Sequence, residues 1–169
     1  MRISTEATES VRHALAEAGL DGRLCQLDDT ARSADDAAAS LNVDVAQIVK
    51  TLIFTFEATS GVFAGQVFPI AALISGDRQC RTDMIPKLME MEGNVRRPKA
   101  DQVKAITGYS IGGVSPIALP DDVIVLMDLA LGRHDALWAA AGHTYVVFHA
   151  TFAELQRLTG ARVTGDISG

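Results

Sequence analysis

The stretch VAQIVKTLIFTF, residues 45–56, decides the fold because it passes from a helical turn into a β-strand within a few residues. Its second half is rich in β-branched and aromatic residues, which favour a strand. Side chains alternate between the two faces of a strand, so Lys50 shares a face with Leu52 and Phe54, whereas Thr51 takes the other face. The sequence therefore predicts a lysine on the more apolar face.

An ammonium group on an apolar strand face has three physical solutions. Its side chain extends to water, it pairs with a carboxylate, or it lines a cavity in which a ligand supplies the negative charge. Ionisable groups in unusual environments often mark functional sites. Lys50 is therefore a candidate site residue, with extension to water as the structural alternative.

Elsewhere the chain mixes helices with mostly short strands. Helices are expected over residues 4–18 (capped by Ser4), 34–41, 83–91 (capped by Thr82), 99–107 and from 151 onward. Further strands are expected over residues 24–27, 61–63, 66–75, 123–127, 136–141 and 145–150. This order is typical of an α+β fold with a mixed sheet. With 169 residues and no linker or repeat, the chain is predicted to be one domain, residues 1–169.

Charge and cysteine content narrow the classes of function. The net charge of -6 argues against a general or sequence-specific DNA-binding protein, because phosphate binding needs positive potential. A basic segment, residues 94–104, nevertheless contains Arg96, Arg97 and Lys99, and is either a solvated surface or a phosphate contact. Two separated cysteines and the absence of an apolar leader or membrane span favour a cytoplasmic protein.

The segment TGYSIGGVSPIALP, residues 107–120, is either a turn or a surface shaped for a ligand. Gly112 and Gly113 leave the peptide edge bare, and Pro116 fixes the exit of the segment. The main-chain N–H groups of Gly113, Val114 and Ser115 would then hold a carbonyl oxygen or an oxyanion.

Common catalytic motifs are absent from the sequence. It has no G-x-S-x-G, H-E-x-x-H, C-x-x-C or phosphate-loop pattern, and its four histidines are scattered. Only His143, which follows Gly142 in a predicted turn, is placed near a site. No metal or cofactor is indicated, so an enzyme of this sequence would act by positioning and electrostatics.

Four segments in this order, IVKTLIF (48–54), TGYSIGGVSP (107–116), WAAAG (138–142) and TFAELQRLTG (151–160), resemble the YbaK/prolyl-tRNA synthetase-associated editing domain family. The resemblance implies a mixed, barrel-like sheet surrounded by helices. It also implies a trans-editing deacylase that hydrolyses the ester of mischarged tRNA, typically tRNA for proline carrying cysteine, alanine or another small amino acid. Prolyl-tRNA synthetase is a possible partner.

The same resemblance suggests roles for individual residues. Lys50 matches the family lysine that orients the terminal nucleotide, and Gly112 to Pro116 matches the loop that holds the aminoacyl end. Substrate-binding residues would be Thr51, Val114, Ser115, Pro116, Gly142 and His143. Arg96, Arg97 and Lys99 would contact the tRNA acceptor stem.

Two other functions remain compatible with the residues. One is a non-catalytic module that binds a nucleotide or tRNA end beside a synthetase. The other is a hydrolase for small esters or amides, which would not need the basic segment.

Overall fold

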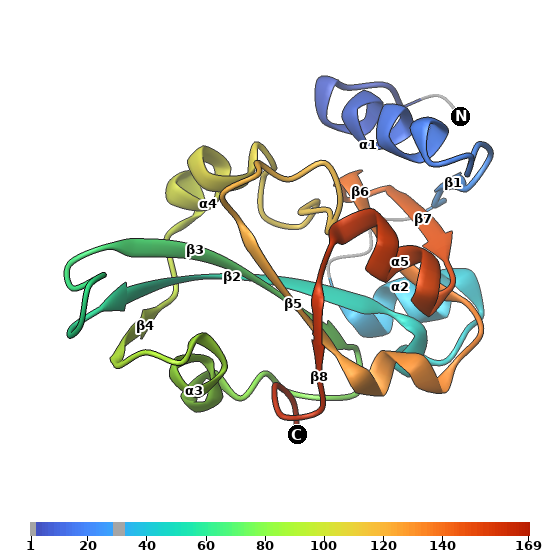
Figure 1. Ribbon diagram of the computed structural model, residues 1–169. Coiled ribbons are helices and arrows are strands. Elements are labelled where there is room, and N and C mark those ends of the chain that lie inside the picture. The colour runs from blue at the N-terminus through green and yellow to red at the C-terminus, as the bar shows by residue number, and fades with distance from the viewer. Residues whose placement is uncertain (1–2, 29–32) are drawn as a thin grey trace.

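The computed structural model describes residues 3–28 and 33–169, and it arranges them as two β-sheets with helices packed around them (Figure 1). The α-helices are α1 (Glu6–Glu17), α2 (Ala34–Leu41), α3 (Ile85–Met89), α4 (Ala100–Thr107) and α5 (Phe152–Thr159), and the 3₁₀ turns are η1 (Val45–Gln47), η2 (Thr82–Met84) and η3 (Leu129–Arg133). The strands are β1 (Leu24–Gln26), β2 (Val49–Ala58), β3 (Val67–Ser75), β4 (Gly93–Arg96), β5 (Ile124–Asp128), β6 (Leu137–His143), β7 (Val146–Ala150) and β8 (Arg162–Thr164). Within the described ranges, no helix is long and apolar enough to cross a membrane.

The larger sheet contains both antiparallel and parallel pairs. Its strand order is β4-β2-β3-β5-β8, with β2 antiparallel to its two neighbours and β5 parallel to β3 and β8. The smaller sheet has the order β1-β7-β6 and is antiparallel. These sheets confirm the predicted α+β class with a mixed sheet. The expected barrel-like sheet takes the form of two sheets, which an isolated parallel bridge between Ile48 and Trp138 connects.

The two faces of β2 pack into different cores, as the alternation of residues 49–56 predicts. Phe54 and Phe56 belong to a core that includes Ile85 of α3. On the opposite face, Val49 joins the core beneath α1 and the smaller sheet, and Ile53 packs with Val103 of α4. Strand β2 therefore runs between the hydrophobic clusters of the molecule.

Helix ends follow the local sequence closely. Ser33 accepts a hydrogen bond from the N–H of Asp36 at the start of α2, and Asn42 ends that helix with a left-handed φ of 55°. Thr151 and Glu154 form a capping box at the start of α5. At α1 the predicted cap was wrong by one residue: Thr5 caps the helix by accepting from the N–H of Thr8.

Two other expectations about elements were wrong, and two strands were not predicted. Residues 61–63 form part of the turn between β2 and β3 rather than a strand, and Gly61 has a φ of 76° there. The helix expected over 83–91, with Thr82 as its cap, is instead η2 followed by the short α3, which ends where Glu90 turns left-handed. Residues 93–96 form β4, and residues 162–164 form β8; the sequence analysis predicted neither.

Candidate functional site

A cavity of about 450 Å³ lies where β2 faces the smaller sheet and the glycine-containing loop, residues 108–117. Its walls come from the start of α2, Ile48 and the following residues 49–53 of β2, Trp138 to Ala140 of β6, Val103 of α4, and the loop. Most of these side chains are apolar. Polar and cationic groups enter from Lys50, Thr51, Arg97 and His143. The cavity therefore combines an apolar wall with a few polar groups, which is the usual composition of a ligand site.

Lys50 lines this cavity and is half-buried. Its Nζ donates a hydrogen bond to the main-chain carbonyl of Arg78. Within the described part of the chain, Lys50 forms no ion pair, because the salt bridges involve other cations. An ammonium carries three donors. The remaining capacity and the uncompensated charge are suited to an anionic or oxygen-rich ligand.

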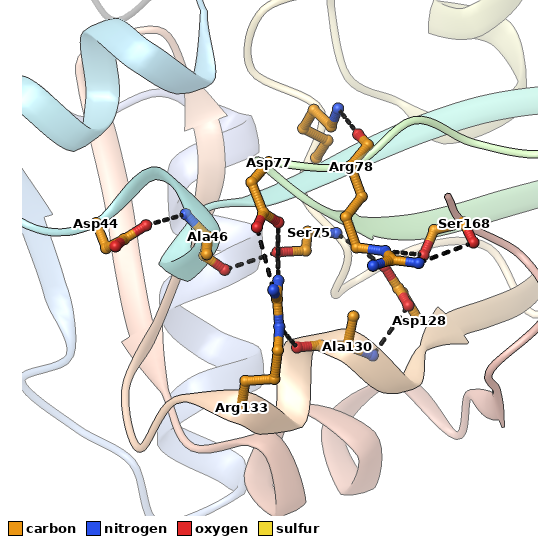
Figure 2. A network of polar contacts seen from close by, with 10 residues as sticks. Asp44, Ala46, Ser75, Asp77, Arg78, Asp128, Ala130, Arg133 and Ser168 are labelled. Atoms are coloured by element: carbon orange, nitrogen blue, oxygen red, sulfur yellow. Dashed lines mark hydrogen bonds and ion pairs between the residues drawn. The ribbon is translucent and has the colours of Figure 1, made fainter.

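The Arg78 carbonyl that accepts the hydrogen bond from Lys50 belongs to a turn stabilised by a polar network (Figure 2). The Asp77 carboxylate accepts two hydrogen bonds from Arg133, at 2.7 and 3.1 Å, and this pairing lowers the pKa of Asp77 to about 2. Arg133 also donates to Ser75 Oγ at 2.9 Å, and the Ser75 hydroxyl is close to Asp77 and Ala46.

The C-terminal segment supports the same turn from the other side (Figure 2). Arg78 Nε donates to Ser168 Oγ at 2.7 Å, and Nη2 donates to the Ser168 carbonyl at 3.1 Å. Main-chain bonds in both directions join Gln79 and Gly169. The acceptor for Lys50 is thus fixed by contacts with residues about 90 positions away in the chain.

The glycine-containing loop is anchored at both ends. The Tyr109 hydroxyl donates to the carbonyl of Ile117 at 2.8 Å, which closes the loop, and burial raises the pKa of Tyr109 to about 12. Thr107 Oγ1 accepts from the N–H of Tyr109 at 3.0 Å. The exposed tip of the loop at Ile111 and Gly112 reaches the cavity.

Glycine is required where this loop packs against the end of β6. A Cβ on Gly113 would lie 2.7 Å from the main-chain nitrogen of His143, closer than real Cβ atoms come. Gly112 has a φ of 94°, and a Cβ there would approach Thr144 to 2.9 Å. Gly142, with a φ of 90°, packs equally tightly against Ala7 of α1. Gly112 and Gly113 thus allow the loop to pack directly against the end of β6, and Gly142 allows α1 to pack there.

The basic segment reaches the cavity through Arg97. Its guanidinium carbon lies 5.4 Å from the centroid of the Phe54 ring, within the range of a cation–π contact. Arg96 and Lys99 are exposed and lie outside the cavity wall. The arrangement therefore places two cations, Lys50 and Arg97, at the same cavity.

The structure brings together only part of the predicted site. Lys50, Thr51, Gly112, Val114, His143 and Arg97 line the cavity, whereas Gly113, Ser115, Pro116 and Gly142 do not. The N–H of Gly113 is committed to the carbonyl of Ser110 at 3.0 Å, and Ser115 and Pro116 are buried behind the loop. Across the described ranges, the N–H groups of Gly112 and Val114 have no acceptor, so these two amides can face a ligand.

Some wall residues were missed by the sequence analysis. Trp138, Ala139 and Ala140 come from β6, and Val147 comes from β7. Apolar residues in a strand usually indicate core packing, and these positions carry no sequence signal that separates a cavity wall from a core. Cys80 lies near Lys50 and Arg97, but burial raises the pKa of its thiol to about 11, so it is a poor nucleophile at neutral pH.

Fold and cavity together define a class of α+β protein with a candidate ligand site at the edge of a mixed sheet. A model of the aminoacyl-tRNA editing domain matches residues 28–158, and the chain belongs to this family.

Individual relatives agree with this assignment. The chain is 24% identical over 159 residues to the uncharacterized protein YwhH of Bacillus subtilis, covering 94% of the chain and 95% of YwhH. It is 26% identical over 113 residues to the proline–tRNA ligase of Solidesulfovibrio magneticus, covering 67% of the chain and 18% of the ligase. A crystal structure reported as “a putative trans-editing enzyme for prolyl tRNA synthetase” superposes with a TM-score of 0.82 at 28% identity, covering 99% of each chain.

Proposed function

We propose that this protein is a trans-editing deacylase that hydrolyses the ester bond of mischarged tRNA. The observation that carries the proposal is the convergence of Lys50, Arg97 and the bare Gly112 main chain on one cavity. The family match and the likeness to a prolyl-tRNA synthetase trans-editing structure support tRNA for proline as the substrate. The limited volume of about 450 Å³ supports a small amino acid, such as cysteine or alanine, together with the terminal ribose.

The cavity matches the parts of an aminoacylated adenosine. Lys50 and Arg97 supply positive charge for the phosphate and ribose oxygens of the tRNA end. The apolar walls would accommodate the amino-acid side chain, and the N–H groups of Gly112 and Val114, which have no acceptor in the described residues, would hold the ester carbonyl oxygen. With these roles, the reaction needs no side-chain nucleophile.

The reaction follows from these roles. A water molecule adds to the ester carbonyl carbon, and the developing negative charge on the carbonyl oxygen is stabilised by main-chain N–H donors. The bond between that carbon and the ribose oxygen then breaks. The ribose oxygen takes up a proton, and the products are free amino acid and uncharged tRNA. Lys50 acts as an anchor that orients the ester, so catalysis depends on positioning.

The test is release of amino acid from a panel of mischarged tRNAs, including tRNA for proline carrying cysteine, alanine or serine. We expect hydrolysis of at least one of them by the wild type. Lys50→Ala should lower the rate by roughly 10- to 150-fold, the value of a lost charge-assisted hydrogen bond. Lys87→Ala, an exposed lysine on α3 outside the cavity, is the matched control and should retain the full rate.

The same panel separates the alternatives. Tight binding of the tRNA end with no hydrolysis of any ester would favour a non-catalytic binding module. Hydrolysis of small esters, with no activity on aminoacyl-tRNA, would favour a small-ester hydrolase. A full rate in Lys50→Ala would contradict the role assigned to that lysine.

A further inference from the structure

We propose that the open edge of β2 binds the aminoacyl group of the substrate through the main chain of Thr51. The inference rests on the proposed function and adds to it the element that recognises the α-amino group and that supplies the ester carbonyl oxygen with a further N–H beside those of Gly112 and Val114. It assigns this recognition to a strand edge rather than to any side chain.

The direction of the main-chain groups of β2 follows from its hydrogen bonds at each end. The N–H of Ala58 donates to the carbonyl of Gln66 at 3.0 Å, and the carbonyl of Ile48 accepts from the N–H of Gly76 at 2.8 Å. The main-chain N–H and C=O groups of even-numbered residues in β2 therefore point toward β3. The N–H of Thr59 donates to Glu92 at 3.0 Å on the opposite side. Because these groups alternate along a strand, residues 51 and 53 face the side on which β4 lies.

Strand β4 covers only the far part of that edge (Figure 1). Its register pairs Thr55 with Arg96 and Ala58 with Gly93. Continued by two residues, this register places Pro98 opposite Ile53, and proline has no N–H to donate. Helix α4 then begins at Ala100 and takes the chain away from the strand. Pro98 therefore ends the ladder and leaves the edge at residues 51–53 uncovered.

The uncovered edge is part of the cavity wall. Thr51 and Ile53 both line the cavity, between the Ile48–Trp138 bridge to β6 on one side and the β4 pairing on the other. In residues 3–28 and 33–169, neither the bridge, the β4 ladder nor a loop contact includes their main-chain N–H and C=O groups on this edge. The hydroxyl oxygen of Thr51 is also buried without a partner there. Buried polar groups are nearly always paired in proteins, so these main-chain and hydroxyl groups are available to a ligand that enters the cavity.

An aminoacyl ester carries the complementary groups in the right order. Its α-ammonium is a donor and its carbonyl is an acceptor, on either side of one carbon, just as in a residue of a β-strand. Set antiparallel to Thr51, it would exchange two hydrogen bonds with the N–H and C=O of that residue. Every α-amino acid shares these groups. The edge thus selects the aminoacyl class, whereas the apolar walls select the side chain.

The test replaces one main-chain N–H by oxygen, by incorporating the α-hydroxy acid analogue of threonine at position 51. Binding of 3′-alanylamino-3′-deoxyadenosine, a non-hydrolysable amide, is measured by calorimetry. We expect about tenfold weaker binding, the value of one neutral hydrogen bond. Binding of 3′-amino-3′-deoxyadenosine, which lacks the aminoacyl group, should not change.

A matched control is the same replacement at Glu57, whose main chain pairs with Asn94 of β4. A main-chain ester at either position makes the carbonyl of the preceding residue, which faces β3, a weaker acceptor. Only the replacement at position 57 also removes an N–H that bonds to β4. The variant with a main-chain ester at position 57 should therefore have a lower melting temperature than the variant with one at position 51, and its probe binding should not change.

Unchanged affinity of the Thr51 ester for the alanyl probe would overturn the inference, while active wild-type deacylation would keep the proposed function intact. Equal loss of affinity for both probes would also overturn it, because the edge would then recognise the nucleoside. If the wild type does not bind the alanyl probe, the inference fails, and the mischarged-tRNA panel decides separately whether the proposed function fails with it.

Discussion

Gly113→Ala provides a sharp test of how the glycine-containing loop shapes the cavity. A Cβ at this position would lie 2.7 Å from the nitrogen of His143 and 2.9 Å from the carbonyl carbon of Gly142, whereas ordinary contacts begin at 3.4 Å. The neighbours are main-chain atoms, and Gly113 is held by bonds to Ser110 and Gly142. The loop must therefore withdraw from β6 by roughly half an ångström or more.

This displacement should affect both stability and rate. Overpacking of this kind costs about 1–3 kcal/mol, which corresponds to a melting temperature lower by roughly 2–12 °C in a protein of this size. Because Gly112 and Val114 flank the shifted residue, their N–H groups would move relative to the ester. A misplacement of about 1 Å can cost a hundredfold in rate, so a loss of roughly tenfold is expected here. Thermal unfolding and single-turnover deacylation measure the two effects.

Gly108→Ala is the matched control. Gly108 has a φ of 81°, so alanine is strained there, but a Cβ would meet no atom within 4 Å and the residue lies outside the cavity wall. It should lose about 1–2 kcal/mol of stability and keep the wild-type rate. The reasoning is refuted if Gly113→Ala unfolds and reacts like the wild type, or if it loses stability with no loss of rate.

Two further predictions concern charge. Arg97→Glu should slow tRNA deacylation far more than Arg96→Glu, because Arg97 lines the cavity and Arg96 does not, and equal losses in a kinetic comparison would contradict this placement. Hydrogen bonds from Arg23 lower the pKa of Glu154 from 4.5 to about 2, so this pair stabilises the fold above about pH 4.5 and its contribution disappears as the pH falls toward 2. In denaturant unfolding, the free energy of unfolding of Glu154→Gln should be lower than that of the wild type above about pH 4.5, and this difference should shrink as the pH falls toward 2. A difference that stays constant over that range would show that the pair does not titrate as described.

The parts of the fold that sequence predicts well are those set by neighbours in the chain. Ser33, Asn42 and the Thr151–Glu154 box satisfy groups three or four residues away, so their sequence pattern suffices. The sequence does not predict β4, because Val95 is the one apolar side chain among its four residues. Pairing with β2 makes this segment a strand. Thr5 rather than Ser4 caps α1, because Thr5 and Thr8 bond to each other in a capping box.

The candidate site divides in the same way. The sequence indicated Lys50 because an ammonium among apolar residues is unusual, whereas the glycine loop was compatible with either a turn or a ligand-binding surface. It could not show that the Gly113 N–H is used by Ser110, that Arg97 lies beside Lys50 at one cavity, or that Ser115 is buried. Those facts depend on how loops pack after the sheets have formed.

By itself, the sequence determined that this protein has an α+β fold with a cation on an apolar strand and a loop that exposes its main chain. Only the tertiary structure decided that these features meet, because Lys50 and the loop residues Gly112 and Val114 line one cavity. Local propensity acts over three or four residues. A binding cavity is made by segments separated by up to about a hundred residues, and their meeting is fixed by packing and hydrogen bonding in three dimensions.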